Sequence, residues 1–135
     1  MDCIFCNIVD GKIPSRKITE TDKSLAFLDA FPLTKGHTLV IPKKHYAKIQ
    51  ELNKEENADL FEIVRILTKK MERLAPSSLV AVHNGKESGQ EVPHVHVHII
   101  PRNIDDSVGP VHSMFSRKPN LTNDEFNNIA EKLRK

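Results

Sequence analysis

The sequence predicts an α+β protein, built on an antiparallel five-stranded sheet with one long amphipathic helix and short terminal helices. Five short runs of apolar or β-branched residues are each bounded by turn residues, which indicates strands. One longer segment repeats apolar residues at helical spacing. The 135 residues contain no internal repeat, low-complexity tract or linker. Residues 1–135 are therefore expected to form a single domain around one core.

The first elements along the chain are short. The opening residues are typical of a helical turn, which Gly11 and Pro14 bring to an end. Strands are expected over residues 17–21 and 25–29, because both runs have the composition of strands. The polar residues 22–24 between them predict a tight turn.

A third strand and the long helix follow. The four residues 38–41 are all apolar or β-branched, so this strand is expected to be buried on both faces. Asn53 is a candidate N-cap with Glu56 three residues further on, which is the pattern of a capping box. Pro76 ends the helical pattern. The apolar positions of the helix recur at Leu60, Ile63, Val64, Leu67, Met71 and Leu74.

The last part of the chain completes the sheet. A fourth strand is expected over residues 79–82 and a fifth over residues 94–100, with a polar, glycine-bearing loop at 84–91 between them. Residues 103–135 are expected to form a loop and then a helix. A second capping-box pattern at Thr122 marks where that helix begins.

Charge and composition argue against several classes of protein. Lys and Arg number 20 against 18 Asp and Glu, which leaves a net charge of +2, whereas nucleic-acid-binding proteins usually carry a clustered basic excess. No run approaches the roughly 18 apolar residues of a membrane span, and no basic region followed by an apolar stretch opens the chain. We therefore expect a cytoplasmic protein that binds neither nucleic acid nor a membrane. The unusual feature is the presence of seven histidines.

Three of these histidines, His94, His96 and His98, alternate with apolar residues in the expected fifth strand. Alternate side chains of a strand share a face, so neighbouring imidazoles start roughly 6.6 Å apart and the outer two roughly 13 Å apart. The three cannot easily converge on one atom, and more than one role is expected. From the residues alone, they fit a polar strand face, a pair of ligands to a catalytic zinc, or a nucleophile with orienting neighbours.

The segment from Gly89 to Arg102, GQEVPHVHVHIIPR, resembles the histidine-triad (HIT) nucleotide hydrolases and transferases, whose hallmark is His-x-His-x-His followed by two apolar residues. Residues 27–32 and 36–45 resemble the N-terminal motif of the same family. The resemblance implies a HIT-like fold. It also implies cleavage of nucleoside phosphoramidates or dinucleoside polyphosphates at the α-phosphorus, through a nucleotidyl-histidine intermediate that releases a nucleoside monophosphate, with AMP expected. The alternative is a nucleotide-binding regulatory or scaffold protein with incidental hydrolysis.

The resemblance also implies roles for individual residues. His96 is expected to attack the α-phosphorus, since an imidazole with an ordinary pKa of about 6.5 has a free lone pair near neutral pH. His98 and His37 match the other active-site histidines, which contact the phosphate or tune the nucleophile. The residues expected to bind the nucleotide, a purine nucleotide, are Asp29 at the ribose, and Asn84, Gly89, Gln90, His96 and His98 around the phosphates. The apolar residues expected near the base are Phe5, Ile8, Phe27 and Leu28.

The chain has only two cysteines, Cys3 and Cys6. On their own they fit a redox pair, a disulfide, half of a metal site or two small buried residues. Related HIT proteins that begin with the same Cys-x-x-Cys spacing hold a structural zinc. Carried over onto this chain, the resemblance implies that the zinc ligands are Cys3, Cys6, His45 and His94. No organic cofactor is expected.

Further expectations come from the same resemblance. It implies a homodimer, and the apolar stripe of the long helix is expected to serve that interface as well as the core. Glu91 stands where eukaryotic phosphoramidase-type members carry a serine that assists near the leaving group, and this departure resembles the microbial-type branch of the family. His83 and His112 are left without an expected role.

Overall fold

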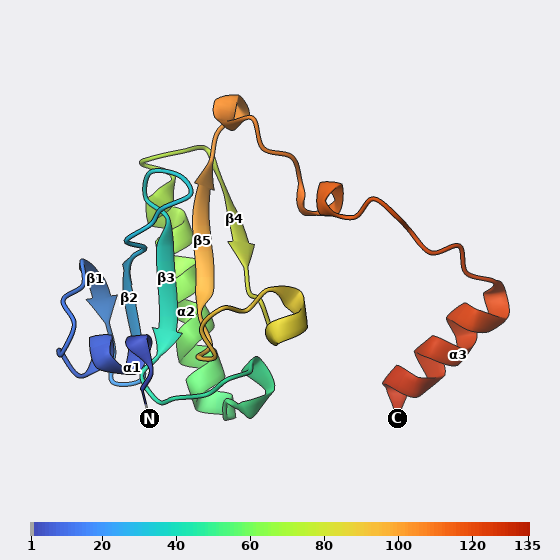
Figure 1. Ribbon diagram of the computed structural model, residues 1–135, viewed down its shortest axis with the longest axis horizontal. Coiled ribbons are helices and arrows are strands. Elements are labelled where there is room, and N and C mark those ends of the chain that lie inside the picture. The colour runs from blue at the N-terminus through green and yellow to red at the C-terminus, as the bar shows by residue number, and fades with distance from the viewer. Residues whose placement is uncertain (1) are drawn as a thin grey trace. The chain divides into compact units, whose positions relative to one another are not determined.

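Five antiparallel strands form one sheet in the order β1-β2-β3-β5-β4, which confirms the predicted fold class (Figure 1). In sheet order, the strands are β1 (Lys17–Glu20), β2 (Ser24–Leu28), β3 (Thr38–Pro42), β5 (Val97–Arg102) and β4 (Ser77–Ala81). Every residue of β3 is buried, as its sequence predicts. The register pairs Leu39 of β3 with Phe27 on one side and with His98 on the other. The centre of the sheet therefore carries one member of the histidine triad.

The computed structural model describes residues 2–135, which divide into two compact units, residues 2–105 and 106–135. The first unit holds the sheet and two α-helices, α1 (Ile4–Val9) and α2 (Lys54–Met71). The second unit holds α3 (Asn123–Arg134). Among the helices of the described residues, none is both long enough and apolar enough to cross a bilayer.

α2 begins with the reciprocal cap that the sequence predicts. The Asn53 side chain accepts a hydrogen bond from the Glu56 N–H (2.8 Å), and the Glu56 carboxylate accepts one from the Asn53 N–H (3.0 Å). The apolar stripe of α2 packs against the sheet, where Leu60 shares one buried cluster with Val40 and Val97. This cluster forms the larger part of the core.

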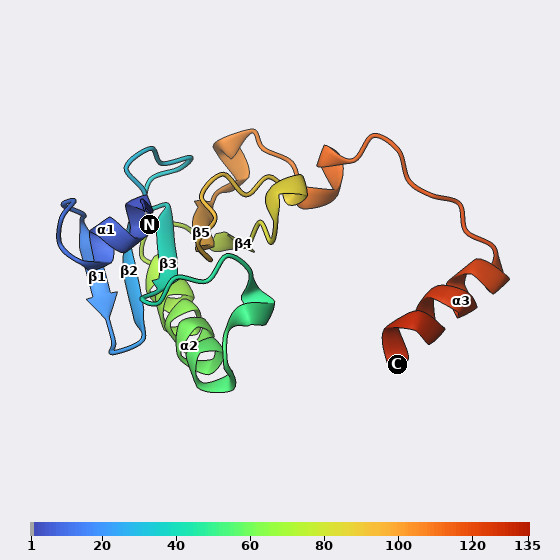
Figure 2. The ribbon, with the colours of Figure 1, turned by 60° about the horizontal axis from the view of Figure 1, so that its bottom comes forward.

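α1 covers the opposite face of the sheet (Figure 2). Successive strand residues point to opposite faces, so Leu39 and Ile41 face away from the α2 side. They form a second buried cluster with Phe27 of β2 and with Cys3 and Phe5 at the start of the chain. The packing of α1 thus brings the first cysteine and an aromatic ring towards the segment that holds the triad.

The fifth strand begins later than predicted, at Val97 instead of His94. The reason is that the N–H of Val95 donates to the carbonyl of Tyr46 (2.7 Å) and does not take part in the sheet ladder. Of the three triad histidines only His98 lies on the strand, and the first two occupy the segment that leads into it.

Other boundaries also differ from the prediction. β1 ends one residue early, β2 is shifted by one residue, and β5 continues to Arg102. α2 ends at Met71, and Leu74, which was expected on its apolar stripe, is 59% exposed. The N–H of Leu74 bonds to the carbonyl of Met71 in a tight turn, which directs the chain away from the helix axis. The fourth strand spans Ser77–Ala81, slightly earlier than the expected residues 79–82.

The second unit consists of a loop followed by a helix, as the sequence predicts. Thr122 and Glu125 form the expected capping box, with hydrogen bonds of 3.1 and 3.2 Å. The loop contains a short 3₁₀ segment at Val111–Met114. That residues 1–135 form a single domain stays a prediction.

Candidate active site

His96 is held in one tautomer. Its Nδ1 lies 2.7 Å from the carbonyl oxygen of His94, so Nδ1 carries the proton and donates, and Nε2 keeps the lone pair. The residue is only 7% exposed, and burial lowers the pKa of His96 below its ordinary value. A neutral imidazole with a directed lone pair is the state that a nucleophile needs.

His37 and His98 form a hydrogen-bonded chain whose direction can be assigned. The N–H of Leu33 donates to Nδ1 of His37 (3.1 Å), so His37 carries its proton on Nε2. That Nε2 lies 2.9 Å from Nδ1 of His98 and donates to it, which leaves the His98 proton on Nε2. The Nε2 atom of His98 is buried and has no partner among the described residues. The chain therefore presents one N–H donor beside His96, whose ring centroid lies 5.0 Å away.

Asp29 lies next to this chain. One of its carboxylate oxygens accepts a hydrogen bond from the N–H of Phe31 (2.9 Å), and the other lies 3.6 Å from Nε2 of His37. Burial lowers the pKa of His37, and the carboxylate of Asp29 opposes this effect only in part. Asp29 is therefore a fixed acceptor at the edge of a group of neutral imidazoles.

Stability should depend on pH through His98. Burial, and then the neighbouring His96 and His37, lower the pKa of His98 to about 4, against about 6.5 in an unfolded chain. Between these values the unfolded chain binds more protons, so the contribution of His98 is fully present above about pH 6.5 and is lost as the pH falls towards 4. We expect a loss on the order of 1–2 kcal/mol in the free energy of unfolding between about pH 7 and pH 5.

Urea denaturation at a series of pH values measures this loss. His98→Gln is expected to make the free energy of unfolding less dependent on pH over this interval, because the amide does not titrate. His112→Gln, which removes an exposed histidine, should keep the wild-type dependence. An equal loss of stability in wild type and in His98→Gln would contradict the assignment.

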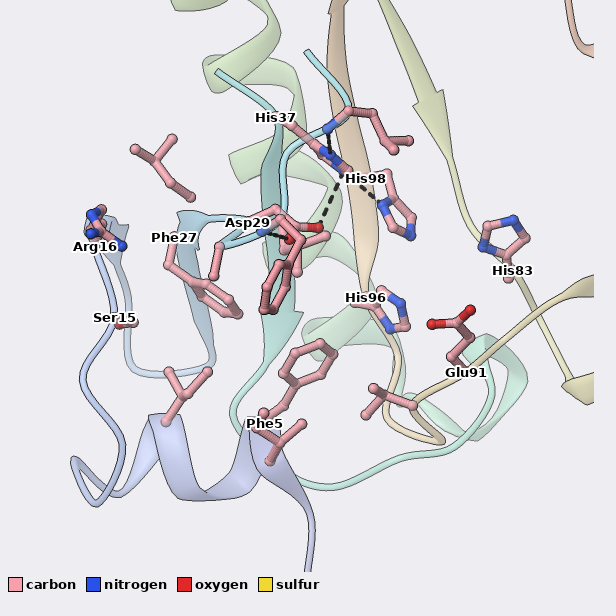
Figure 3. A pocket seen from close by; sticks show the side chains of 18 of the residues that line it. Phe5, Ser15, Arg16, Phe27, Asp29, His37, His83, Glu91, His96 and His98 are labelled. Carbon is pink, nitrogen blue, oxygen red and sulfur yellow. Dashed lines mark hydrogen bonds and ion pairs between the residues drawn. The ribbon is translucent and has the colours of Figure 1, made fainter. Parts of the chain in front are cut away.

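The histidines open into a pocket of about 510 Å³ in the first unit (Figure 3). This volume lies within the usual range for small-molecule sites. The structure brings together most of the residues that the sequence singles out. The predicted site residues that line the pocket are Phe5, Ile8, Phe27, Leu28, Asp29, His37, Gly89, His96 and His98.

Two predicted nucleotide-binding residues, Asn84 and Gln90, are not among the residues that line the pocket. The Asn84 side chain accepts a hydrogen bond from the N–H of Ile49 (2.9 Å). The Gln90 side chain accepts one from the N–H of Gly85 (2.9 Å) and donates one to the carbonyl of Ala47 (2.8 Å). Both side chains thus hold the loop in place. Their contact with a nucleotide stays a prediction.

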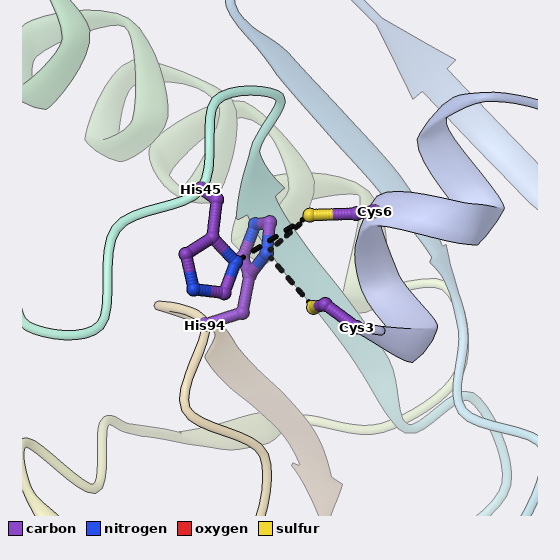
Figure 4. Close-up of side chains that lie close together, drawn as sticks. All are labelled: Cys3, Cys6, His45 and His94. Atoms are coloured by element: carbon purple, nitrogen blue, oxygen red, sulfur yellow. Dashed lines mark hydrogen bonds between the residues drawn. The ribbon is translucent and has the colours of Figure 1, made fainter. Parts of the chain in front are cut away.

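Cys3, Cys6, His45 and His94 lie together on the other side of the triad segment (Figure 4). Their ligand atoms all lie within 4.8 Å of one another. Nδ1 of His94 is 3.4 Å from Sγ of Cys3 and 3.6 Å from Sγ of Cys6, and Sγ of Cys6 is 3.4 Å from Nδ1 of His45. A tetrahedral zinc with ordinary bond lengths sets sulfur and nitrogen ligands roughly 3.6 Å apart. The four predicted ligands therefore fit a zinc ion.

The surroundings of the cluster also suit a metal. Nε2 of His94 lies 2.8 Å from the carbonyl oxygen of Pro42 and donates to it, so the lone pair of Nδ1 faces the thiols. Both cysteines are free. Burial, and then the neighbouring Cys3, raise the pKa of the Cys6 thiol, so a cation is needed to hold the pair as thiolates.

The triad histidines are therefore divided between different environments. His94 lies with the cysteines, whereas His98 lies with His37 and Asp29 in a second group that could hold a metal. His96 belongs to neither group. Among the described residues, no metal position is thus shared by all three triad histidines, which disfavours a catalytic zinc bound by the whole triad.

The sequence did not point to His83 as a site residue, yet it lines the pocket. Its ring meets that of His98 edge-on, with centroids 5.4 Å apart. The loop that carries Gly89 folds back over the His83 ring, and a Cβ at Gly89 would lie 3.3 Å from Cδ2 of His83. The sequence signal that could have found it is the position of His83 at the start of the loop expected around the phosphates. Ser15 and Arg16 also line the pocket and were not predicted.

Comparisons with known proteins agree with this arrangement. The HIT domain family matches residues 10–105 of the chain. The adenosine 5'-monophosphoramidase hnt1 of Schizosaccharomyces pombe is 50% identical over 103 residues, which are 76% of this chain and 75% of that protein. The protein hit of Bacillus subtilis is 44% identical over 105 residues, which are 75% of this chain and 71% of that protein.

Solved structures of histidine-triad proteins are also similar to this chain. A HIT family member from Bacillus subtilis matches with a TM-score of 0.87 at 34% identity, over 99% of this chain and 96% of that chain. A Zn-bound histidine triad family protein from Mycobacterium smegmatis matches with a TM-score of 0.76 at 33% identity, over 89% of this chain and 85% of that chain. The motif, the fold and these relatives together show that the chain belongs to the histidine-triad (HIT) family.

Proposed function

We propose that the protein is a nucleotide hydrolase that forms a covalent nucleotidyl intermediate on His96 and releases a nucleoside monophosphate. The observation that carries the proposal is the fixed tautomer of His96. Its Nδ1 donates a hydrogen bond to the His94 carbonyl, which leaves the Nε2 lone pair free. The similarity to an adenosine 5'-monophosphoramidase of Schizosaccharomyces pombe supports nucleoside phosphoramidates as substrates and AMP as the product. Dinucleoside polyphosphates are the second substrate class that the site can accept.

In the first step, the lone pair of His96 Nε2 forms a bond to the α-phosphorus. The bond from phosphorus to the leaving group breaks, and its electron pair departs with that group. When the nitrogen of a phosphoramidate is protonated before the attack, the leaving group departs as a neutral amine. The N–H of His98 donates to an oxygen of the α-phosphate in this transition state. The imidazolium that results keeps its proton on Nδ1, which still donates a hydrogen bond to the carbonyl oxygen of His94.

In the second step, a water oxygen bonds to the same phosphorus, and the pair of the N–P bond returns to Nε2 of His96. The nucleoside monophosphate leaves with the water oxygen, and one water proton passes to the solvent. Splitting one displacement into two gives the first step a better nucleophile than water, and it gives the second step the His96 imidazole as its leaving group. The chain from Leu33 through His37 keeps His98 in the donor tautomer through both steps.

The nucleoside is proposed to bind at the end of the pocket formed by α1 and β2. Phe5 and Phe27, whose centroids lie 5.8 Å apart, supply aromatic surface for a purine base. Asp29 is proposed to accept hydrogen bonds from the ribose hydroxyls. We also propose that Asn84, Gly89 and Gln90 contact the phosphates, with the first and last of these acting from the loop that they hold in place.

We propose that Cys3, Cys6, His45 and His94 bind a structural zinc ion. The ligand spacing and the protonation of His94 support this, and so does the Zn-bound relative from Mycobacterium smegmatis. When bound, zinc supplies a link between α1 and the segment that positions His96.

A homodimer is also proposed. β4 lies at one edge of the sheet and pairs with β5 alone, and its Val80 is 43% exposed. On α2, Ile66 is 41% exposed. An open strand edge and exposed apolar residues suit pairing with a second copy. Analytical ultracentrifugation measures the state directly.

The proposed function is tested by offering adenosine 5'-phosphoramidate and a diadenosine polyphosphate to the wild-type protein and measuring AMP release by chromatography. Release of AMP from either compound supports the hydrolase. Tight binding of AMP without turnover of either compound would contradict it and would favour the nucleotide-binding regulatory protein.

The ribose contact of Asp29 can be isolated with a double-mutant cycle. Removing the 2'-hydroxyl from an adenosine phosphoramidate should lower kcat/KM of wild type by roughly tenfold or more, since a hydrogen bond to a charged group contributes about 1.5–3 kcal/mol. In Asp29→Ala the same change of substrate should have little effect. Asp22→Ala, in an exposed turn, is the control with the wild-type ratio. An equal loss in wild type and Asp29→Ala would contradict the contact.

A further inference from the structure

The aromatic rings of the pocket form a row that gives it two ends (Figure 3). Phe27 contacts Phe5 at 5.8 Å, and Phe5 contacts His96 at 5.1 Å. The row continues from His96 to His98 at 5.0 Å and from His98 to His83 at 5.4 Å. The reacting histidines thus lie in the middle of the row, between one end at Phe27 and the other at His83.

The charges of the pocket are divided between the same two ends. Among the described residues that line it, the formally charged side chains are Arg16, Asp29 and Glu91. Figure 3 shows Arg16 and Asp29 on the Phe27 side of His96, and Glu91 on the His83 side with its carboxylate between His96 and His83. The His83 end therefore carries one formal charge, and that charge is negative.

The side chains of His83 and Glu91 at this end are both available to a ligand. Among the described residues, no hydrogen bond or ion pair is made by the side chains of His83 or Glu91, whereas one carboxylate oxygen of Asp29 accepts a hydrogen bond from the N–H of Phe31. The backbone of Gly89, with a φ of +103°, passes close to the His83 ring. The carboxylate of Glu91 is therefore free to meet a ligand at this end.

We infer that the leaving group binds at the His83 end of the pocket. There the Glu91 carboxylate makes the enzyme prefer nucleoside phosphoramidates whose amine also carries a positively charged group. The inference rests on the proposed function, which places the nucleoside at the Phe27 end. An in-line displacement places the leaving atom across the phosphorus from Nε2 of His96. With the nucleoside at the Phe27 end, the part of the pocket left for the rest of the leaving group is the His83 end. The inference adds no chemical step, because the bonds that form and break are those of the reaction proposed above.

A preference of this kind is electrostatic. A carboxylate attracts an ammonium group and repels a carboxylate or a phosphate at the same place. The α-phosphate is common to all substrates, so its own repulsion from Glu91 cancels when leaving groups are compared. Because Glu91 is exposed, the effect should be moderate and should shrink as salt is added.

Three substrates that differ only in terminal charge test the inference: the adenosine 5'-phosphoramidates of putrescine, butylamine and γ-aminobutyrate. With wild type at low ionic strength, kcat/KM should fall from the cationic through the neutral to the anionic compound, with a total span of about tenfold or more. Glu91→Gln should reduce this span to near unity. Glu87→Gln, a change of the same charge on the same loop but outside the pocket, should leave the span unchanged.

The outcomes separate this inference from the function on which it rests. If Glu91→Gln turns over all three compounds with the wild-type ratios, the inference is wrong and the proposed function stands. If wild type releases AMP from adenosine 5'-phosphoramidate or a diadenosine polyphosphate but turns over none of the three, the inference is wrong and the proposed function stands. If wild type binds AMP but turns over none of these compounds, the proposed function is wrong and the inference falls with it. The inference is supported if the differences in kcat/KM among the three compounds disappear in Glu91→Gln but not in Glu87→Gln. The same differences should become smaller in wild type at high salt.

Discussion

Replacing His96 by alanine is expected to lower kcat/KM for adenosine 5'-phosphoramidate by at least roughly 10⁴-fold, since removal of a covalent nucleophile eliminates the step on which turnover depends. The affinity for AMP should change little. The base and ribose are proposed to bind at Phe5, Phe27 and Asp29, and the tautomer of His98 that donates from Nε2 is fixed by His37 and not by His96. Steady-state kinetics with isothermal titration of AMP measures both quantities.

A matched control is His112→Ala, which removes an exposed histidine from the second unit and should keep wild-type kinetics. His96→Gly offers a further check, because free imidazole in solution can enter the space that is vacated and restore part of the turnover. Activity in His96→Ala within about tenfold of wild type would contradict the nucleophile assignment.

Removal of zinc is expected to have the largest effect on stability. If free zinc stands roughly a thousandfold above its Kd, binding contributes about 4 kcal/mol to the free energy of unfolding. For a protein of this size that loss lowers Tm by roughly 15 °C. The chelator-treated protein should therefore melt well below the untreated one. Differential scanning calorimetry with metal analysis of the same sample measures the effect.

Cys6→Ser gives the matched comparison, because it removes one sulfur ligand with almost no change in volume. The variant should melt at the lower temperature from the start and should be insensitive to chelator. Purified wild type without stoichiometric zinc, together with a Tm that chelator does not move, would show that the cluster of cysteines and histidines is not a zinc site.

The sequence predicted the fold because its signals were local and strong. The capping box at Asn53 and the apolar stripe of α2 required no knowledge of the remaining chain. The run at residues 38–41 was apolar enough to predict a strand buried on both faces. The start of the fifth strand was predicted three residues too early, because the N–H of Val95 donates to the carbonyl of Tyr46, a residue far away in sequence.

The candidate site was predicted less completely than the fold. The motif pointed to the histidines, and the spacing argument correctly excluded a single centre for all three. The tautomers could not be predicted, since they depend on the N–H of Leu33 and the carbonyl of His94. The place of His83 in the pocket depends on how a loop folds back over it, and the only sign of it in the sequence is that His83 stands at the start of that loop.

For two other site residues, the sequence indicated the residue but not the contacts of its side chain. Asn84 and Gln90 were predicted as phosphate contacts, and the structure shows both side chains bonded to the backbone of neighbouring segments. A polar residue in a loop has several backbone groups within reach, and the sequence does not specify which it will bind. Only packing decides this.

The central claim is the covalent intermediate, and trapping it is the most direct test. Wild-type protein is mixed with adenosine 5'-phosphoramidate, quenched within the first turnover under mildly alkaline denaturing conditions, and analysed by intact and peptide mass spectrometry. We predict a mass increase of one AMP less one water, located on His96 and absent from His96→Ala. Rapid turnover without any adduct, or an adduct located on another residue, would contradict the account.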